Sequence, residues 1–369
     1  MLKPQYVGWL SIGVAGLVSC RTAPPQIQPI SWPHALRPAT AQTPPAAPAK
    51  PLPVIKTPAT NGSSAWPSNW VNSWLPLADW AAFNGLDQPR QTADRPQPVF
   101  DVRTSHGILT VTANQQAIRW DGVACWLSYA PKVIAGQLCL HALDAQKTLQ
   151  PLLHLGAPPC LTGRTIVIDP GHGGKDAGTQ AASGYGHEKD LALDWALRVG
   201  RLLTAAGWTV VLTRTNDSNR SIPERVAVAD QARADLFLSL HFNSGQPSQT
   251  LSGIETYCLT PVGLPSNLVH EGTDDPRQVF PNNAHDAMNL QWAFRLHAAL
   301  VRETEAVDRG LRRARFLGVL RWQQRPAVLV EAGYLSHPAE ARRIASAEYR
   351  QKLAEAVAKA LNGAGKREA

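Results

Sequence analysis

The chain has 369 residues and a formal net charge of +8, from 36 Lys and Arg against 28 Asp and Glu. This length permits one large domain or two, with ample chain to bury a core. The basic balance favours acidic surroundings such as nucleic acid, anionic lipid or an anionic polymer. No run of Lys and Arg is dense enough to indicate nucleic acid, so we expect no nucleic-acid partner.

The first twenty residues have the features of an export signal. Lys3 supplies a positive charge ahead of an apolar segment, residues 7–18, which is too short to span a bilayer. Small residues then precede Cys20, which resembles the lipobox of bacterial lipoproteins, where cleavage occurs before the cysteine and its thiol is lipidated. The alternatives are an ordinary secretory signal with an incidental cysteine and a transmembrane anchor. We expect residues 1–19 to be a signal peptide, the mature chain to be exported to the cell envelope, and Cys20 to anchor it to a membrane.

Residues 20–65 have the composition of a tether. Eleven prolines occur between residues 21 and 65, separated by Ala, Thr and Gln, with few large apolar side chains. Such a segment buries too little surface to offset the entropy lost on ordering. We therefore expect an extended, disordered linker that holds the folded part away from a membrane.

A small α+β module is predicted at residues 66–157. A short helix at 76–83 precedes alternating apolar runs that indicate strands at 99–102, 108–111, 117–120 and 125–127. Asp121-Gly122 between two of these runs is a hairpin signal. This pattern resembles the copper-amine-oxidase N-terminal-like domains found beside bacterial envelope enzymes, although no copper ligands are evident. The role of the module is open.

Two features of this module allow alternative interpretations. Its clustered tryptophans favour core and interface packing over a platform for sugars; they are Trp66, Trp70, Trp74 and Trp80. Cys125 and Cys139 lie in neighbouring candidate strands, and an exported compartment permits a disulfide between them or two free thiols.

Strands and helices alternate through a second domain, residues 162–365. Strands are predicted at 165–169, 208–214, 235–240, 254–259, 315–321 and 327–333, and helices at 190–206, 222–234, 287–305 and 347–361. The pattern indicates a three-layer α/β/α domain around a central, twisted, mostly parallel sheet. Residues 262–287 are polar, contain Pro and Asn, and are too long for a simple connection, so we expect a loop there.

Four polar residues stand where open α/β sheets hold their ligands. His172 follows the strand at 165–169 on a glycine-rich loop, and His241 follows the strand at 235–240 directly. Glu188 opens the first helix, and Glu331 lies within an apolar strand, where a carboxylate needs a partner. Two imidazoles and one carboxylate form a catalytic zinc set with a position left open for water. Glu331 then serves as the general base and acid.

Each of these residues also has a structural interpretation. Glu188 could be a charge favoured at a helix start, His241 a satisfied core histidine, and Glu331 the buried partner of Arg214 or Arg225. We read both arginines as structural, pairing with carboxylates. Glycines 171, 173 and 174 are expected to clear space beside the metal for a bulky ligand.

Five linked motifs in this domain resemble one family. They are Asp169-Pro170-Gly171-His172-Gly173-Gly174, Glu188-Lys189-Asp190-Leu191, Leu212-Thr213-Arg214-Thr215, Ser239-Leu240-His241-Phe242-Asn243-Ser244 and, from 328 to 336, Val-Leu-Val-Glu-Ala-Gly-Tyr-Leu-Ser. Together, over residues 163–362, they strongly resemble the zinc N-acetylmuramoyl-L-alanine amidases of bacterial envelopes. The resemblance implies that His172, Glu188 and His241 bind Zn²⁺ and that Glu331 is catalytic.

The same resemblance implies a substrate and a reaction. The family cleaves the amide between the lactyl group of N-acetylmuramic acid and the L-alanine of the peptidoglycan stem peptide. In some relatives a segment near 262–287 occludes the zinc until a partner moves it, so a lid and a protein activator stay open. The competing hypotheses are a catalytically inactive wall-binding protein that recruits a partner, and a zinc peptidase that cuts within the stem peptide.

Overall fold

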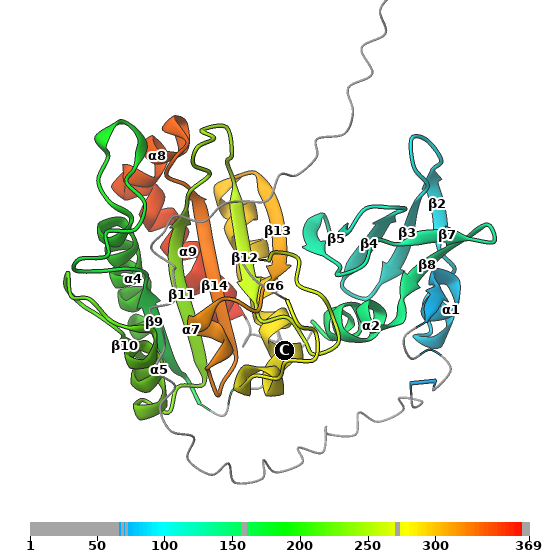
Figure 1. The fold of residues 1–369 in the computed structure, drawn as a ribbon, viewed down its shortest axis with the longest axis horizontal. Coiled ribbons are helices and arrows are strands. Elements are labelled where there is room, and N and C mark those ends of the chain that lie inside the picture. Colours follow the sequence, from blue (N-terminus) through cyan, green and yellow to red (C-terminus); the bar gives the residue numbers. More distant parts are fainter. Residues whose placement is uncertain are drawn as a thin grey trace, which may run out of the picture. The chain divides into compact units, whose positions relative to one another are not determined.

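A computed structural model describes residues 66–67, 70, 73–155, 161, 163–269 and 274–363 of the chain (Figure 1). The predicted signal peptide, Cys20 and the proline-rich segment lie outside the described residues. Within those residues, none of the helices combines the length and the apolar character that crossing a membrane requires.

The larger of two sheets has 11 strands in the order β10-β9-β11-β14-β12-β13-β6-β5-β4-β3-β2. Its first six strands are β10 (Thr209–Leu212), β9 (Thr165–Pro170), β11 (Leu236–Asn243), β14 (Ala327–Tyr334), β12 (Ile254–Cys258) and β13 (Asp308–Arg313). The first four are parallel, and β12 runs antiparallel to β14. The predicted mostly parallel sheet is therefore confirmed.

Helices cover both faces of this part of the sheet (Figure 1). One face packs against α4 (Glu188–Ala205), α6 (Asp286–Thr304) and α9 (Ala347–Asn362), and the other packs against α5 (Ile222–Gln231) and α7 (Gly318–Arg321); α8 (Pro338–Ala345) follows β14. The predicted three-layer architecture is confirmed. Most of the helices match the predicted ranges, whereas α7 and α8 were not predicted.

Alternation along the strands divides the core between the two faces. On β9, Ile166 and Ile168 join the larger apolar cluster under α4, while Val167 joins the smaller cluster under α5 and α7. On β11, Leu238 and Leu240 face the larger cluster and Phe237 the smaller one, because successive side chains point to opposite faces. The α5/α7 face is thus the one on which the polar residues near the strand ends project.

The N-terminal module continues the same sheet. Its strands are β6 (Val123–Trp126), β5 (Ala117–Trp120), β4 (Gly107–Thr112), β3 (Val99–Thr104) and β2 (Arg90–Ala93), and a second sheet contains β1 (Trp74–Pro76), β8 (Gln137–His141) and β7 (Lys132–Ile134). The helical elements are α1 (Leu77–Phe83), α2 (Ala142–Asp144), a π-helical turn at Ala145–Leu149 and α3 (Gln150–Leu153). Strand β6 pairs in parallel with β13, and Asp308 on β13 accepts a hydrogen bond from the backbone N–H of Ala124 at 2.8 Å.

One predicted strand was wrong. Residues 315–321 contain the helix α7, and the strand lies earlier, at β13. Strand β13 carries Asp308, three arginines and one leucine instead of an apolar run. Its charged side chains are accommodated because they have partners from other elements. Asp308 pairs with His297 at 3.0 Å and Arg313 donates to Thr148 at 2.7 Å. A strand whose polarity is compensated by distant residues has no local apolar signal.

The cysteines of the described residues are free. Cys125 on β6 and Cys139 on β8 lie in different sheets, so the disulfide considered between them does not form. Burial raises the pKa of Cys125 to about 12, despite the nearby Arg313, so this thiol is a small core residue. The tryptophans Trp66 and Trp70 pack edge to face against Phe83, which supports the packing interpretation.

Candidate metal centre

The candidate residues come together at the carboxyl ends of neighbouring parallel strands. His172 lies two residues beyond β9, and Glu188 is the first residue of α4. Across the sheet, His241 on β11 is in register with Glu331 on β14, which is in register with Glu255 on β12. Residues in register project from the same face, so the sheet itself aligns an imidazole and two carboxylates in one row.

His172, Glu188 and His241 form a convergent group. Their ligand atoms all lie within 4.8 Å of one another. Glu188 Oε1 is 3.0 Å from His172 Nε2 and 3.0 Å from His241 Nδ1. Two imidazole nitrogens and one carboxylate oxygen aimed at a common point are the donor set of a catalytic zinc site, so these residues fit the metal.

The backbone around His172 is shaped to bring the two rings close. A Cβ on Gly171 would lie 2.2 Å from His241 Cε1, and a Cβ on Gly178 would lie 2.7 Å from both His172 and Glu188. His172 itself has φ +60°, a left-handed conformation that costs a non-glycine residue about 1–3 kcal/mol. The expectation that the loop glycines clear space for a ligand was wrong at Gly171, since the ring of His241 occupies that space.

The charges at this group favour a cation. Burial acts to lower the pKa of His172, but the carboxylates of Glu188 and Asp176 outweigh it and raise the pKa to about 10. Burial acts to raise the pKa of Glu188, but the two imidazoles prevail and hold it well below its ordinary value. The backbone N–H groups of Thr179 and Phe242 also donate to Glu188, at 3.0 and 3.1 Å.

Glu331 differs from the other three residues because its buried carboxyl group has an oxygen without a hydrogen-bond partner. It is 2 % exposed, and its Oε2 has no hydrogen-bond partner among the described residues. Burial, reinforced by the charges of Glu188 and Glu255, raises the pKa of Glu331 well above its ordinary value. The alternative pairing with Arg214 or Arg225 is wrong.

Both arginines have other partners. Arg225 pairs with Asp169 at 2.6 Å, as expected of a structural arginine. Arg214 donates to the carbonyl oxygens of Pro170 and Gly171, at 3.1 and 2.7 Å, and so binds backbone where we expected a carboxylate. These bonds fix the end of β9 just ahead of His172.

Residues 166–363 match the family model described as N-acetylmuramoyl-L-alanine amidase, which is more than half of the chain. The chain belongs to this amidase family. It is 34% identical over 198 residues to the N-acetylmuramoyl-L-alanine amidase LytC of Bacillus subtilis, a match that covers 53% of this chain and 34% of LytC. It is 33% identical over 216 residues to the uncharacterized protein YqiI of the same organism, covering 58% of this chain and 90% of YqiI.

Solved amidase structures are also similar. The N-acetylmuramoyl-L-alanine amidase from Clostridium difficile 630 is 30% identical, with a TM-score of 0.45, over 54% of this chain and 94% of that chain. The family model, which matches more than half of the chain, confirms the resemblance found in the sequence at the level of the family. The chain spans about a third of the length of LytC.

Two residues beside the candidate metal centre were missed by the sequence reasoning. Asp176 Oδ1 lies 2.9 Å from His172 Nδ1, on the side of the ring away from Glu188. The spacing of four residues on one glycine-rich loop was the available signal. Glu255 lies inside β12, and its partners come from β11 and β13, so no local pattern reveals it.

Glu255 is the centre of a buried polar cluster next to Glu331. It is fully buried and accepts hydrogen bonds from Tyr257 at 2.6 Å, Asn243 at 3.1 Å and Arg309 at 2.9 Å. Arg312 lies 3.5 Å away. Burial acts to raise the pKa of Glu255, but Arg312 and Arg309 outweigh it and lower the pKa. Asn243 also accepts a hydrogen bond from the backbone N–H of Ser244 at 2.7 Å.

The loop after β12 lies away from the metal group. Its described residues contain one short 3₁₀ helix, Pro281–His285, and Asp274 of this loop pairs with Arg315 at 2.5 Å. Ser128 of the N-terminal module donates to Pro265 at 2.7 Å. Among the described residues of this loop, none forms a hydrogen bond or ion pair with His172, Glu188 or His241, so an occluding lid finds no support there.

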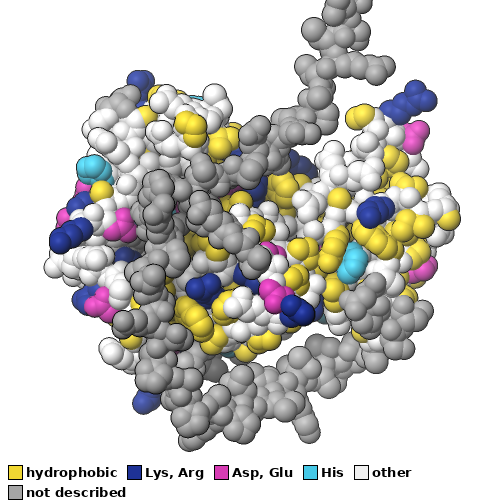
Figure 2. Space-filling view, viewed as in Figure 1, with side chains coloured by type: hydrophobic (Ala, Val, Ile, Leu, Met, Phe, Trp, Pro, Cys, Tyr) yellow, Lys and Arg dark blue, Asp and Glu magenta, His cyan; other side chains and the backbone are white. Residues whose placement is uncertain are grey.

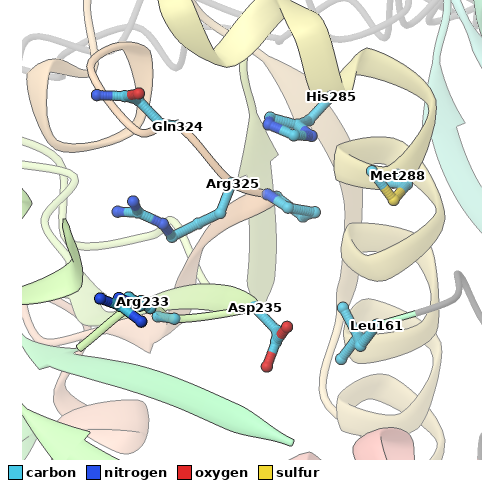
Figure 3. A pocket seen from close by; sticks show the side chains of 9 residues that line it. Leu161, Arg233, Asp235, His285, Met288, Gln324 and Arg325 are labelled. Atoms are coloured by element: carbon cyan, nitrogen blue, oxygen red, sulfur yellow. The ribbon is translucent and has the colours of Figure 1, made fainter. Parts of the chain in front are cut away.

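A cavity of about 350 Å³ lies at the opposite end of the sheet. Asp235 and Pro326, which line it, immediately precede β11 and β14, so the cavity adjoins the amino ends of strands whose carboxyl ends carry the metal group. Figure 3 shows Arg325, His285 and Asp235 around it. This cavity therefore does not serve the amidase centre.

Proposed function

We propose that the chain hydrolyses the amide between the lactyl group of N-acetylmuramic acid and L-alanine in peptidoglycan, with His172, Glu188 and His241 holding Zn²⁺. The observation that carries the proposal is Glu331, a buried carboxyl group with an unpartnered oxygen, in register with His241. A buried group without a partner is costly, and such groups concentrate at sites of chemistry.

The chemistry divides between the metal and the chain. A bound zinc ion supplies a Lewis acid for the carbonyl oxygen and acidifies a water molecule. Glu331 takes a proton from the attacking water as its oxygen bonds to the carbonyl carbon. Glu331 then delivers that proton to the nitrogen as the C–N bond breaks. Burial raises the pKa of Glu331, which favours its keeping the proton between the two steps.

Several groups of the chain would keep the ligands in place. Asp176 would hold the orientation of His172 through the ion-pair contact between its Oδ1 and Nδ1 at 2.9 Å, which leaves Nε2 free to bind the metal. Glu188 is oriented by the backbone N–H groups of Thr179 and Phe242. A site whose ligands are held in this way needs little reorganisation when it binds.

The direct test is the variant Glu331→Ala on purified sacculi. We expect it to lose at least about 10²–10⁴-fold in amide cleavage, the contribution of a general acid–base group, while still binding one zinc ion. Glu348→Ala, an exposed carboxylate in the first turn of α9, is the matched control and should retain full activity. Wild-type release of stem peptides by Glu331→Ala would contradict the assignment.

Product analysis separates this function from its competitors. Mass spectrometry should find glycan with free lactyl groups and intact stem peptides. Cuts between amino acids of the stem would indicate a peptidase, and no products would indicate an inactive binding protein. A chelator should abolish cleavage and added zinc should restore it; full turnover by metal-free protein would rule out the mechanism.

We also propose that the protein acts in the cell envelope, attached through a lipid on Cys20. The family acts on the cell wall, and the sequence before Cys20 has the small residues of a lipobox. On the face shown in Figure 2, Lys and Arg side chains are scattered among acidic and uncharged ones. Labelling with a radioactive fatty acid that persists in Cys20→Ala would contradict the anchor.

A further inference from the structure

The order of residues across the sheet gives the site a direction. Of the candidate metal ligands, His172 follows β9, His241 lies on β11 and Glu188 begins α4. Glu331 is on the next strand, β14. Because the general acid must reach the leaving nitrogen, the nitrogen lies on the Glu331 side of the metal. The peptide beyond that nitrogen therefore continues toward β12 and β13.

Arg309 on β13 lies along this direction. Its Nε donates to Glu255 at 2.9 Å, and its guanidinium lies over the ring of Tyr334, 5.2 Å from the ring centroid. The side chain is 17% exposed, and within the described residues it donates through Nε and through neither of its two terminal nitrogens. A guanidinium that is fixed through Nε and keeps the N–H donors of its terminal nitrogens available is suited to binding a carboxylate.

The local charge also favours an anion. Arg309 and Arg312 contribute two positive charges and share the single carboxylate of Glu255. Arg312 is only 4% exposed and lies against Trp126, 4.3 Å from the ring centroid. Of the two guanidinium groups that share Glu255, that of Arg309 is therefore the accessible one. Glu255 is itself held by Tyr257 and Asn243, so it anchors the guanidinium rigidly.

We propose that Arg309 binds a carboxylate on the second residue of the stem peptide and selects substrates that carry it; this inference rests on the proposed function. The carboxyl group of the lactyl unit is consumed in the scissile amide, so the nearest anions of the substrate belong to the peptide. Strand β13 is two strands from β14, about 10 Å at the usual spacing. Two extended residues span about 7 Å, and the guanidinium covers the rest.

The experiment compares two soluble muramoyl peptides that differ only in the second residue, which carries either a free carboxylate or a carboxamide. We expect wild-type protein to prefer the carboxylate about 10- to 100-fold in kcat/KM, the range for a hydrogen bond to a charged group. Arg309→Gln should abolish the preference, and Arg309→Lys should keep part of it. Arg201→Gln, an exposed arginine on α4, is the matched control and should leave the preference unchanged.

The outcomes distinguish this inference from the proposed function. Failure of wild-type protein to cleave either peptide, or sacculi, would count against the function itself. Equal cleavage of both peptides by wild-type protein, or a preference that survives in Arg309→Gln, would overturn the role of Arg309. Zinc content and thermal unfolding of each variant show whether the fold is intact, and if Arg309→Gln unfolds, the wild-type comparison and Arg309→Lys decide the matter.

Discussion

Asp169 and Glu331 are two carboxylates on the same face of the same sheet, and they are 1% and 2% exposed. Asp169 on β9 accepts hydrogen bonds from Arg225 at 2.6 Å, Thr213 at 2.6 Å and Ser239 at 2.8 Å. Glu331 on β14 has an oxygen with no partner among the described residues. Burial is equal in the two cases, so it is the presence or absence of partners that separates a structural carboxylate from a chemical one.

The difference has an energetic meaning. A buried charge that is paired and fully hydrogen-bonded holds its neighbours together, and its removal leaves those neighbours unpaired. A buried carboxyl without partners stabilises nothing and costs desolvation. Glu255, two strands from His241, is of the first kind, although it borders Glu331. The same row of the sheet thus contains both kinds of carboxylate in adjacent strands.

The largest expected effect on stability comes from Asp169→Asn. It would leave the guanidinium of Arg225 buried without a counter-charge, and we expect a loss of about 3–5 kcal/mol in the free energy of unfolding. Denaturant unfolding in the presence of a chelator measures it. Glu331→Gln is the matched control, and its denaturant concentration at the unfolding midpoint should be at least that of wild type. Equal destabilisation by both variants would contradict the distinction between the paired carboxylate of Asp169 and the unpaired one of Glu331.

A smaller, pH-dependent effect is expected for Glu255→Gln. At pH 7 the variant should lose about 2–3 kcal/mol, because charged hydrogen bonds become neutral ones. The pKa of Glu255 is lowered from 4.5 in the folded state, so its contribution is present above pH 4.5 and disappears as the pH falls through the lowered value. The difference between variant and wild type should therefore shrink in acid. A difference that is constant between pH 7 and pH 3 would argue against the ion pairs.

The smallest effect is predicted for Asp176→Asn, which tests the metal group without touching a ligand. Loss of the carboxylate behind His172 should weaken zinc binding about 10- to 100-fold. Competition with a chromophoric chelator measures the affinity. Asp217→Asn is the control, since Asp217 binds Lys189 and the backbone of Gly174 on the same side of the fold but not the imidazole. Equal zinc affinities in the two variants would show that Asp176 does not support zinc binding.

Much of the site could be predicted from sequence because its residues sit at recognisable places. His172 and His241 each leave an apolar strand, and Glu331 interrupts one, so each stands out against its neighbours. Glu188 could be recognised only through its position at the start of the predicted helix. Asp176 and Glu255 were missed, the first because a loop carboxylate has many uses, the second because its partners are brought to it by β11 and β13.

The sequence by itself determined the α/β class, the family and most of the order of strands and helices in the amidase domain, since apolar periodicity and the five motifs are local properties of the chain. Only the tertiary structure decided which carboxylates have partners, where β13 lies and how β6 extends the sheet. The reason is physical: Asp308, Arg309 and Arg313 look like surface residues in the sequence, and the fold brings them partners from other elements, among them His297, Glu255 and Thr148.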